Sequence, residues 1–207
     1  MASQAVNHEV KEDDSVEDGF HSSYKNKDLS FKDVLQTITA TINPKIVVEY
    51  GILDGYSLNT FVQHSQSDCQ FFAYDIFEKF VGNGARKEVL DGRFDQYSNV
   101  HIANGDFFDA PVILEDGTVD ILHIDIANNG DVYEFAVTNL LSKLSEHGVM
   151  ILEGGTAARD EVEWMSKFNK RAINPYLLSL QTSDSVSVNI IGNFPGLTII
   201  KKKRIVQ

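Results

Sequence analysis

The stretch Glu49-Tyr50-Gly51-Ile52-Leu53-Asp54-Gly55-Tyr56-Ser57 lies between a short apolar run and a segment with helical character. The apolar run, residues 45–48, is rich in β-branched side chains and is typical of a buried parallel strand. Gly51 and Gly55 allow the backbone to approach a ligand closely, and the N–H groups that begin a helix near Ser57 favour a carboxylate or a phosphate. The stretch therefore predicts a strand-to-helix turn that holds a ligand with an anionic end.

Acidic residues end four of the strand-like runs. Ligands bind outside the carboxyl ends of the strands in an open parallel sheet, so we expect these acids to surround one site. Asp75 lies 75 − 49 = 26 positions after Glu49, close to the offset of about 20 residues expected for an acid that binds a ribose. The acids and the runs that they follow are Glu49 after 45–48, Asp75 after 70–74, Asp125 after 119–124 and Glu153 after 148–152.

Segments with helical spacing separate these runs. Ser30 begins a Ser-x-x-Asp capping pattern in front of an apolar face, and Pro44 ends this first helix. The alternation of strand and helix predicts an α/β fold with a doubly wound, mostly parallel sheet that is covered on both faces. Further helices are expected near 57–65, 84–97, 131–144 and 157–171, and then three strand-like runs follow without a helix, at 176–180, 186–191 and 197–201.

The composition indicates one domain. The chain has 207 residues, of which 43% are hydrophobic, and this is enough to bury a sizeable core. Residues 1–24 are acidic and lack a periodic apolar pattern, so we expect a flexible N-terminal segment followed by a single α/β domain over 25–207.

Charge and cysteine content narrow the function classes. The formal charge of −12 argues against nucleic-acid binding, which depends on Lys and Arg neutralising phosphates. Cys69 is the single cysteine and leaves no intrachain disulfide, and the sequence contains neither an apolar run of about 18 residues nor a signal-peptide pattern. We therefore expect a soluble protein of the cytoplasm, with no membrane partner.

The order Glu-x-Gly-x-x-x-Gly-x-Ser resembles the first motif of class I S-adenosylmethionine-dependent methyltransferases, and the strand-end acids resemble their later motifs. The resemblance covers roughly residues 30–203. Within this superfamily the chain is most similar to small sugar and natural-product O-methyltransferases, the macrocin O-methyltransferase-like group, because Asp75-Ile76-Phe77-Glu78 matches their second strand end. The resemblance implies a Rossmann-like sheet of seven strands with a C-terminal antiparallel hairpin.

The resemblance also implies S-adenosylmethionine as the cofactor. In that family the glycine turn wraps the methionine part, the acid before it places the amino group, the acid of the second strand binds the ribose, and the Asp106-Phe107 pair lines the adenine. Carried over to this chain, the cofactor-binding residues are Glu49, Gly51, Asp54, Gly55, Ser57, Asp75, Ile76, Asp106, Phe107 and Asp125.

The implied reaction is methyl transfer to a hydroxyl of a small polar acceptor such as a sugar or a metabolite. Asp125 is the first choice for the base, with His123 and Glu153 as alternatives. Relatives carry paired acids after the fifth strand that bind a divalent metal together with the fourth-motif acid. Here Glu153 is followed by two glycines, so Mg²⁺ held by Asp125 and Glu153 stays an open alternative.

Other interpretations also stay open. The missing second acid after Glu153 is compatible with a noncatalytic S-adenosylmethionine-binding protein. An NAD-binding oxidoreductase would share Asp75, although the Gly-x-Gly-x-x-Gly fingerprint is absent. Arg159 either faces an anionic substrate or forms an exposed ion pair with Asp160 or Glu163. A homodimer is the default expectation for a soluble enzyme.

Overall fold

The computed structural model describes residues 25–26, 29–79 and 82–203. The predicted flexible segment 1–24 lies outside these residues. Among the helices that are described, none is long and apolar enough to cross a membrane.

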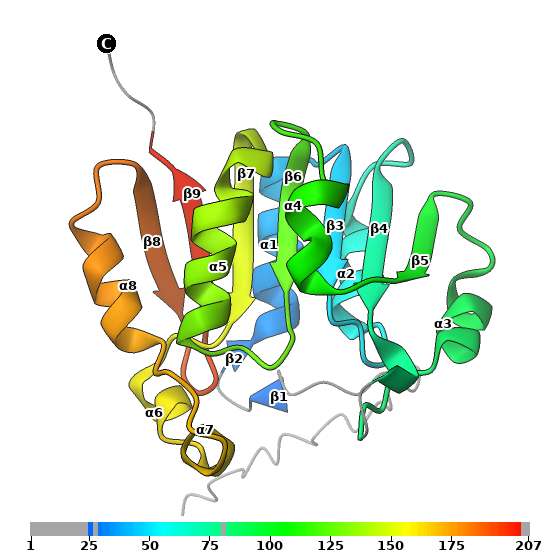
Figure 1. The fold of residues 1–207 in the computed structure, drawn as a ribbon. Coiled ribbons are helices and arrows are strands. Elements are labelled where there is room, and N and C mark those ends of the chain that lie inside the picture. The colour runs from blue at the N-terminus through cyan, green and yellow to red at the C-terminus, as the bar shows by residue number, and fades with distance from the viewer. Residues whose placement is uncertain (1–24, 27–28, 80–81, 204–207) are drawn as a thin grey trace, which may run out of the picture.

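A seven-stranded sheet forms the centre of the fold, in the order β5-β4-β3-β6-β7-β9-β8 (Figure 1). The first five of these strands in chain order run parallel, and the last two form an antiparallel hairpin at one side, which confirms the predicted sheet. The bounds are β3 (Ile46–Tyr50), β4 (Gln70–Asp75), β5 (Val100–Asn104), β6 (Val119–Ile124), β7 (Leu144–Glu153), β8 (Val186–Ile191) and β9 (Leu197–Lys202). A separate two-stranded sheet, β1 (Lys25–Asn26) and β2 (Leu29–Ser30), precedes them.

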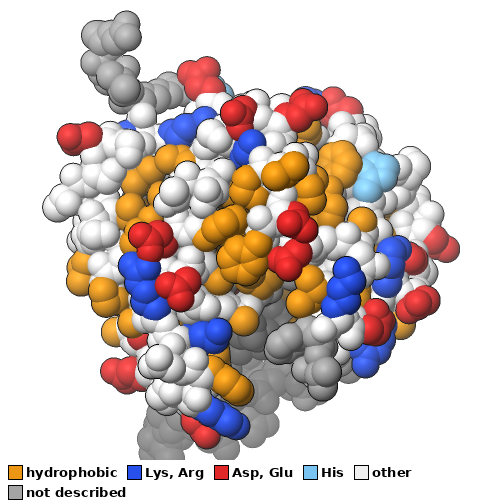
Figure 2. Space-filling model, viewed as in Figure 1, with side chains coloured by type: hydrophobic (Ala, Val, Ile, Leu, Met, Phe, Trp, Pro, Cys, Tyr) orange, Lys and Arg blue, Asp and Glu red, His pale blue; other side chains and the backbone are white. Residues whose placement is uncertain are grey.

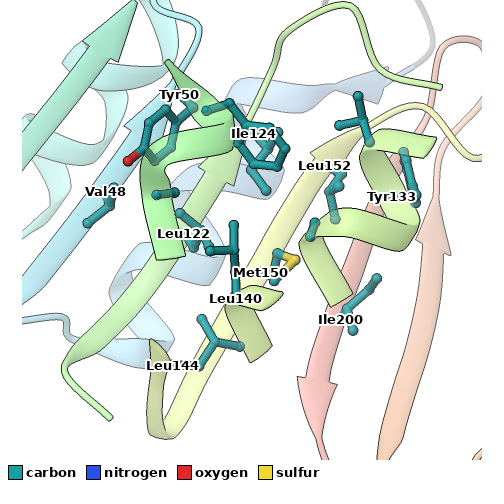
Figure 3. Packing of buried hydrophobic residues seen from close by; sticks show 14 of the residues in the cluster. Val48, Tyr50, Leu122, Ile124, Tyr133, Leu140, Leu144, Met150, Leu152 and Ile200 are labelled. Atoms are coloured by element: carbon teal, nitrogen blue, oxygen red, sulfur yellow. The ribbon is translucent and has the colours of Figure 1, made fainter. Parts of the chain in front are cut away.

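Helices cover both faces of the sheet and bury two apolar cores. The helices α1 (Phe31–Ile42), α2 (Tyr56–His64) and α3 (Lys87–Phe94) pack on one face. The helices α4 (Ala110–Ile113), α5 (Gly130–Leu140) and α8 (Asn174–Gln181) pack on the other. Figure 3 shows this second core, in which side chains of the central strands meet Tyr133 and Leu140 of α5. Alternate residues of each strand thus face opposite cores, as a doubly wound sheet requires.

The cap of the first helix follows the sequence pattern. Ser30 accepts a hydrogen bond from the N–H of Asp33 at 3.4 Å, and α1 ends at Ile42 before Pro44. Asn43 takes a left-handed conformation with φ of 50°, and its N–H donates to the carbonyl of Thr39.

The region after β7 differs from the sequence prediction. The run 176–180, predicted as a strand, belongs to helix α8, and this leaves β8 and β9 as the two strands of the hairpin. Pro175 lies in the first turn of α8, where a missing N–H costs nothing. The carboxylate of Asp160 accepts from the N–H groups of Ile173 at 2.6 Å and Asn174 at 2.9 Å. These bonds hold the start of α8, and of the apolar run Leu177 is buried in the second core while Leu178 is exposed.

The helix predicted over 157–171 is also interrupted. It consists of α6 (Ala157–Asp160) and α7 (Glu163–Lys167), followed by a loop in which Asn169 has a φ of 47°. The chain turns back at this point because Asp160 binds the start of α8. The other predicted helices agree with the structure within a few residues, and β7 begins at Leu144 instead of Gly148.

The turn after β3 depends on Gly51, and its substitution gives the first prediction. Gly51 has a φ of 87°, and a Cβ at this position would lie 2.0 Å from the carbonyl oxygen of Asp125. We expect Gly51→Ala to lower the free energy of unfolding by about 2 kcal/mol or more, because of backbone strain and this clash. Urea denaturation measures the change.

Gly92 in α3 is the matched control, because nothing lies within 4 Å of a Cβ at this position. In a helix interior, Gly92→Ala is expected to raise stability by about 0.5 to 1 kcal/mol. Equal effects of the two substitutions would contradict the assigned role of Gly51.

Candidate active site

A cavity of about 500 Å³ lies at the carboxyl ends of the parallel strands, between the loops that follow β3, β4, β5 and β6. Parallel strands present these ends at the same edge, and the strand order reverses between β3 and β6, where doubly wound sheets bind ligands. Six of the ten predicted cofactor residues line the cavity: Gly51, Asp75, Ile76, Asp106, Phe107 and Asp125. The other four, Glu49, Asp54, Gly55 and Ser57, do not line it and instead support the turn.

Asp75 is held at the end of β4 by three hydrogen bonds. Its Oδ2 accepts from the N–H of Ile52 at 2.9 Å, and its Oδ1 accepts from the N–H of Phe77 at 2.8 Å and from Nδ2 of Asn83 at 2.7 Å. A carboxylate offers about four acceptor positions, so one remains for a ligand hydroxyl. The bond to Ile52 also ties the turn after β3 to the end of β4.

Aromatic side chains form one wall of the cavity. Tyr50 stacks on Tyr74 with ring centroids 5.1 Å apart, and Phe107 meets Tyr50 edge to face at 5.7 Å. Asp106 caps the turn that carries Phe107, since its Oδ1 accepts from the N–H of Phe108 at 3.0 Å. Beside the cavity, on the face of the sheet that α4 and α5 cover, Figure 2 shows hydrophobic side chains gathered over these helices, with acidic side chains beside them. This wall suits a flat, apolar ring with polar edges.

A buried polar network lies beneath the glycine turn. Glu49 is fully buried, and its Oε1 accepts hydrogen bonds from the hydroxyl of Ser57 and from Nδ1 of His123, the latter at 2.8 Å. The second oxygen, Oε2, is buried and has no hydrogen-bond partner among the described residues. Burial lowers the pKa of His123. The hydrogen bond to Glu49 and the negative charge of that carboxylate raise the pKa, and together with the neighbouring acids they outweigh burial, so the pKa lies above its ordinary value.

Helix α2 begins directly above this network. Gly55 occupies the position before its first turn with a φ of 83°, and no side chain caps the helix. The N–H of Gly55 donates to the carbonyl of Ile52 at 2.8 Å, and this hydrogen bond closes the turn. Oδ1 of Asp54 lies 3.9 Å from Nη1 of Arg93, and this ion pair fixes the outer side of the same turn.

Glu153, at the end of β7, is bound by Arg159. Nε of Arg159 lies 2.8 Å from Oε1 and Nη2 lies 3.2 Å from Oε2, and both residues are buried. The exposed pair of Arg159 with Asp160 or Glu163 is therefore wrong, and contact of Arg159 with an anionic substrate stays a prediction. Burial raises the pKa of Glu153, and the hydrogen bonds to Arg159 oppose this rise.

Asn128 and Asn129, which follow Asp125, have different roles. The Nδ2 of Asn128 donates to the carbonyls of Ile124 at 2.9 Å and Glu153 at 3.0 Å, and so it joins the ends of β6 and β7. Asn129 lines the cavity and caps α5, since its Oδ1 accepts from the N–H groups of Asp131 and Val132.

The three candidate bases are now distinguishable. Asp125 lines the cavity. His123 has no exposed surface and binds Glu49, while Glu153 has both oxygens bound by Arg159. Of the three candidates, Asp125 is thus the one that lines the cavity.

The donor set does not fit the expected Mg²⁺. A divalent ion bound by Asp125 and Glu153 would lie beside the guanidinium of Arg159, which binds both oxygens of Glu153 and would repel a second cation. In the part of the chain that the structure describes, no group of three His, Cys, Asp or Glu side chains has the arrangement to hold a metal.

The residues do fit S-adenosylmethionine. Asp75 keeps an acceptor position for the ribose, Phe107 and the two tyrosines offer a ring surface for the adenine, and the buried Oε2 of Glu49 is an unused acceptor near the turn. The cavity volume is also in the range of small-molecule sites.

Sequence reasoning missed several residues of the site. Tyr50 and Tyr74 lie inside strands, where an aromatic residue normally indicates core, and Asn83 lies in a loop without a recognisable motif. Lys170 lines the open side of the cavity from the loop between α7 and α8, far along the chain from the other residues. The residues that carried a sequence signal are those of the glycine turn, the strand-end acids, Ile76 and the Asp106-Phe107 pair.

A protein-family model described as "Methyltransferase domain" matches residues 48–153, just over half of the chain. The range begins within β3 and ends at Glu153, so it contains every strand end that borders the cavity. No curated protein matches the chain.

Solved structures of methyltransferases have a similar fold. The SAH-bound methyltransferase PaMTH1 of Podospora anserina has a TM-score of 0.65 and 16% identity, over 84% of this chain and 78% of that one. The O-methyltransferase of Bacillus cereus in complex with SAH has a TM-score of 0.65 and 15% identity, over 88% and 84%. TomG of Streptomyces achromogenes, an O-methyltransferase involved in tomaymycin synthesis and solved with SAM, has a TM-score of 0.65 and 14% identity, over 84% and 80%.

The raised pKa of His123 gives a pH prediction. Its folded-state pKa lies above the unfolded value of about 6.5, so this bond stabilises the protein fully below about pH 6.5 and the stabilisation is lost as the pH rises through the folded pKa. We expect the free energy of unfolding to fall over this window by about 1.4 kcal/mol per unit of raised pKa. Urea denaturation at a series of pH values measures it.

Variants separate this effect from other titrations. Glu49→Gln removes the charge that raises the pKa and is expected to abolish this fall, whereas His101→Gln, at an exposed histidine stacked on Phe72, is expected to retain it. Identical pH profiles for the wild type and Glu49→Gln would contradict the assignment.

Proposed function

The chain belongs to the methyltransferase-domain family, and we propose that it transfers the methyl group of S-adenosylmethionine to a hydroxyl of a small, polar acceptor such as a sugar or another hydroxylated metabolite. The observation that carries the proposal is the cavity at the reversal of strand order, in which Gly51, Asp75, Phe107 and Asp125 meet from four different strand ends. This arrangement supports the proposal that different strand ends recognise different parts of the cofactor.

Different residues of the chain bind different parts of the cofactor. Asp75 accepts from the ribose hydroxyls, and Asp106 accepts from the exocyclic amine of an adenine that lies against Phe107. The uncapped start of α2 favours the carboxylate of the methionine part. Glu49 supplies a negative charge beneath the turn for the amino group.

S-adenosylmethionine supplies a methyl group that is already activated by its sulfonium. The protein therefore contributes mainly by holding the acceptor oxygen in line with that methyl and by excluding water, which can account for about 7 to 11 kcal/mol of a barrier when the alignment is good. Asp125 accepts the hydroxyl proton at its carboxylate as the new bond forms.

The acceptor side of the cavity supports a polar, hydroxylated molecule. Ala127, Asn129, Val132 and Lys170 line it next to Asp125. Asn129 offers amide hydrogen-bonding groups, Val132 an apolar surface, and Lys170 a positive charge that has no ion pair among the residues described. This mixture of groups suits a compact metabolite better than a polymer.

Three expectations accompany this proposal and stay predictions: a cytoplasmic location, the absence of nucleic-acid binding, and a homodimer. The first two rest on the acidic composition and the single cysteine. The third rests only on the general frequency of dimers among soluble enzymes.

Binding of the cofactor is the first test. Calorimetric titration of the wild type with S-adenosylmethionine and S-adenosylhomocysteine, with NAD as control, is expected to show binding of the first two alone. Asp75→Ala and Asp75→Asn are expected to weaken that binding about tenfold or more, because hydrogen bonds to a charged group contribute about 1.5 to 3 kcal/mol.

The exposed Asp95→Ala variant is the control for a general loss of negative charge and is expected to bind normally. Since Asp75 also holds two loops, the melting temperature of each variant is recorded alongside. An unchanged affinity in a folded Asp75→Ala protein would reject the proposed site, and binding of NAD alone would point to an oxidoreductase.

Turnover is the second test. With a panel of hydroxylated acceptors, formation of S-adenosylhomocysteine is expected, and Asp125→Asn is expected to lower kcat by about 10² to 10⁴-fold with cofactor affinity largely retained. Cofactor binding without turnover of any acceptor would favour the noncatalytic alternative. A normal kcat in Asp125→Asn would remove Asp125 from the role of base.

A further inference from the structure

The end of β7 carries one acid and then two glycines whose conformations exclude a second acid. Gly154 and Gly155 have φ values of 104° and 107°, which side-chain-bearing residues rarely adopt. A Cβ on Gly155 would lie 2.1 Å from Oγ1 of Thr198, and a Cβ on Gly154 would lie 3.2 Å from Cγ of Arg159. The space beside Glu153 is therefore occupied by Arg159.

The guanidinium of Arg159 is fixed on several sides. It binds both oxygens of Glu153, its Nη2 also donates to the carbonyl of Asn128 at 3.2 Å, and its plane lies over the ring of Trp164 at 5.0 Å. Only 5% of its surface is exposed.

The positive charge stands at the part of the site that is richest in carboxylates. Asp125 and Glu153 end neighbouring strands, and Glu49 lies one strand further. The charge of Asp125 raises the pKa of Glu153 and also that of His123, so these groups share one electrostatic environment. A cluster of this kind needs a compensating cation, and the chain supplies one from α6.

We propose that Arg159 is the resident cation of the acceptor side of this site, that its guanidinium holds Glu153 in the way that a divalent ion would, and that the protein binds no metal there. Arg159 also acts as a positioning residue, because its bond to the carbonyl of Asn128 fixes the loop that begins at Asp125. The consequence for catalysis rests on the proposed function, but the metal-binding claim does not.

The test uses Mn²⁺ as the probe, with the free ion followed by electron paramagnetic resonance in the presence of the full chain. The wild type is expected to leave the Mn²⁺ signal unchanged up to about 1 mM, with or without S-adenosylmethionine, and its melting temperature is expected to be the same in EDTA and in Mg²⁺. Stoichiometric Mn²⁺ binding that Glu153→Gln abolishes would overturn the proposal.

Variants of the pair test whether Arg159 is what keeps the metal out. Arg159→Gln frees the carboxylate of Glu153 and is expected to acquire Mn²⁺ binding, and the double variant Arg159→Gln with Glu153→Gln is expected to lose it again. Failure of a folded Arg159→Gln protein to acquire Mn²⁺ binding would count against the proposal. If Arg159→Gln does not fold, the wild-type titration still decides.

The melting temperatures of the same variants form a double-mutant cycle. Each single substitution leaves a buried charge unpaired and is expected to lower the melting temperature by about 5 °C or more. The double variant is expected to have a melting temperature no lower than that of the less stable single variant. Lys87→Gln, in an exposed pair with Asp91, is the control and is expected to have a small effect. Additive losses would show that the buried pair does not form.

If the wild type does not bind S-adenosylmethionine, the proposed function is rejected, but the conclusion from the Mn²⁺ titration is unaffected. Stoichiometric Mn²⁺ binding at Glu153 would reject the resident cation and would leave the methyltransferase proposal intact. The two proposals can thus fail separately.

Discussion

The close contact between the backbone of Gly51 and the backbone of Asp125 is the constraint on which the site depends. The strands β3 and β6 pair in parallel at the centre of the sheet, and the N–H of Asp125 donates to the carbonyl of Tyr50 at 2.9 Å. At this separation no side chain fits between the turn and the strand end. Main-chain geometry therefore places the turn at Gly51, which is proposed to receive the cofactor, beside Asp125, which is proposed to accept the proton. Substitutions of side chains elsewhere are expected to change this geometry little.

Around this contact, the acidic groups divide into two sets. Glu49 and Glu153 are buried and bound, the first by Ser57 and His123 and the second by Arg159. Asp75 and Asp125 line the cavity, and Asp75, although it is also buried and bound, keeps one acceptor position there. Burial of a carboxylate is tolerated only with such partners, so the two pairs allow an acid-rich edge of the sheet to fold. Asp125, the acid proposed as the proton acceptor, differs from Glu49 and Glu153 because it lines the cavity.

The methyl transfer proposed for this site asks little of the protein beyond alignment and a proton acceptor, since the methyl donor is already activated. The structure is consistent with that demand, because the cavity lies at the ends of paired strands and Arg159 fixes Glu153 at the end of the neighbouring strand β7. A guanidinium carries one delocalised charge and keeps a fixed geometry, whereas a divalent ion brings two charges and exchangeable water ligands. The acceptor would thus be oriented by protein groups alone.

Much of the fold was predictable from local sequence. The parallel strands were recognised because each is a short apolar run that ends in an acid or a polar turn, and the glycine turn was recognised because its spacing is specific. The run 176–180 was not, because a short apolar segment fits a strand or a buried helix equally well. Its helical state depends on Asp160, which lies more than a dozen residues earlier and binds the start of α8.

The sequence by itself thus determined the α/β class, the strand ends that form the site and six of the residues that line it, since these depend on periodicity and on motifs within a few positions. Only the tertiary structure decided the partners. His123 binds Glu49 because β3 and β6 pair in the sheet, and Arg159 binds Glu153 because the chain after β7 folds back onto the strand end. Spacing along the chain does not show which buried charged groups pair with one another. That pairing distinguishes the acids that are bound inside the protein from the acid proposed to accept the proton.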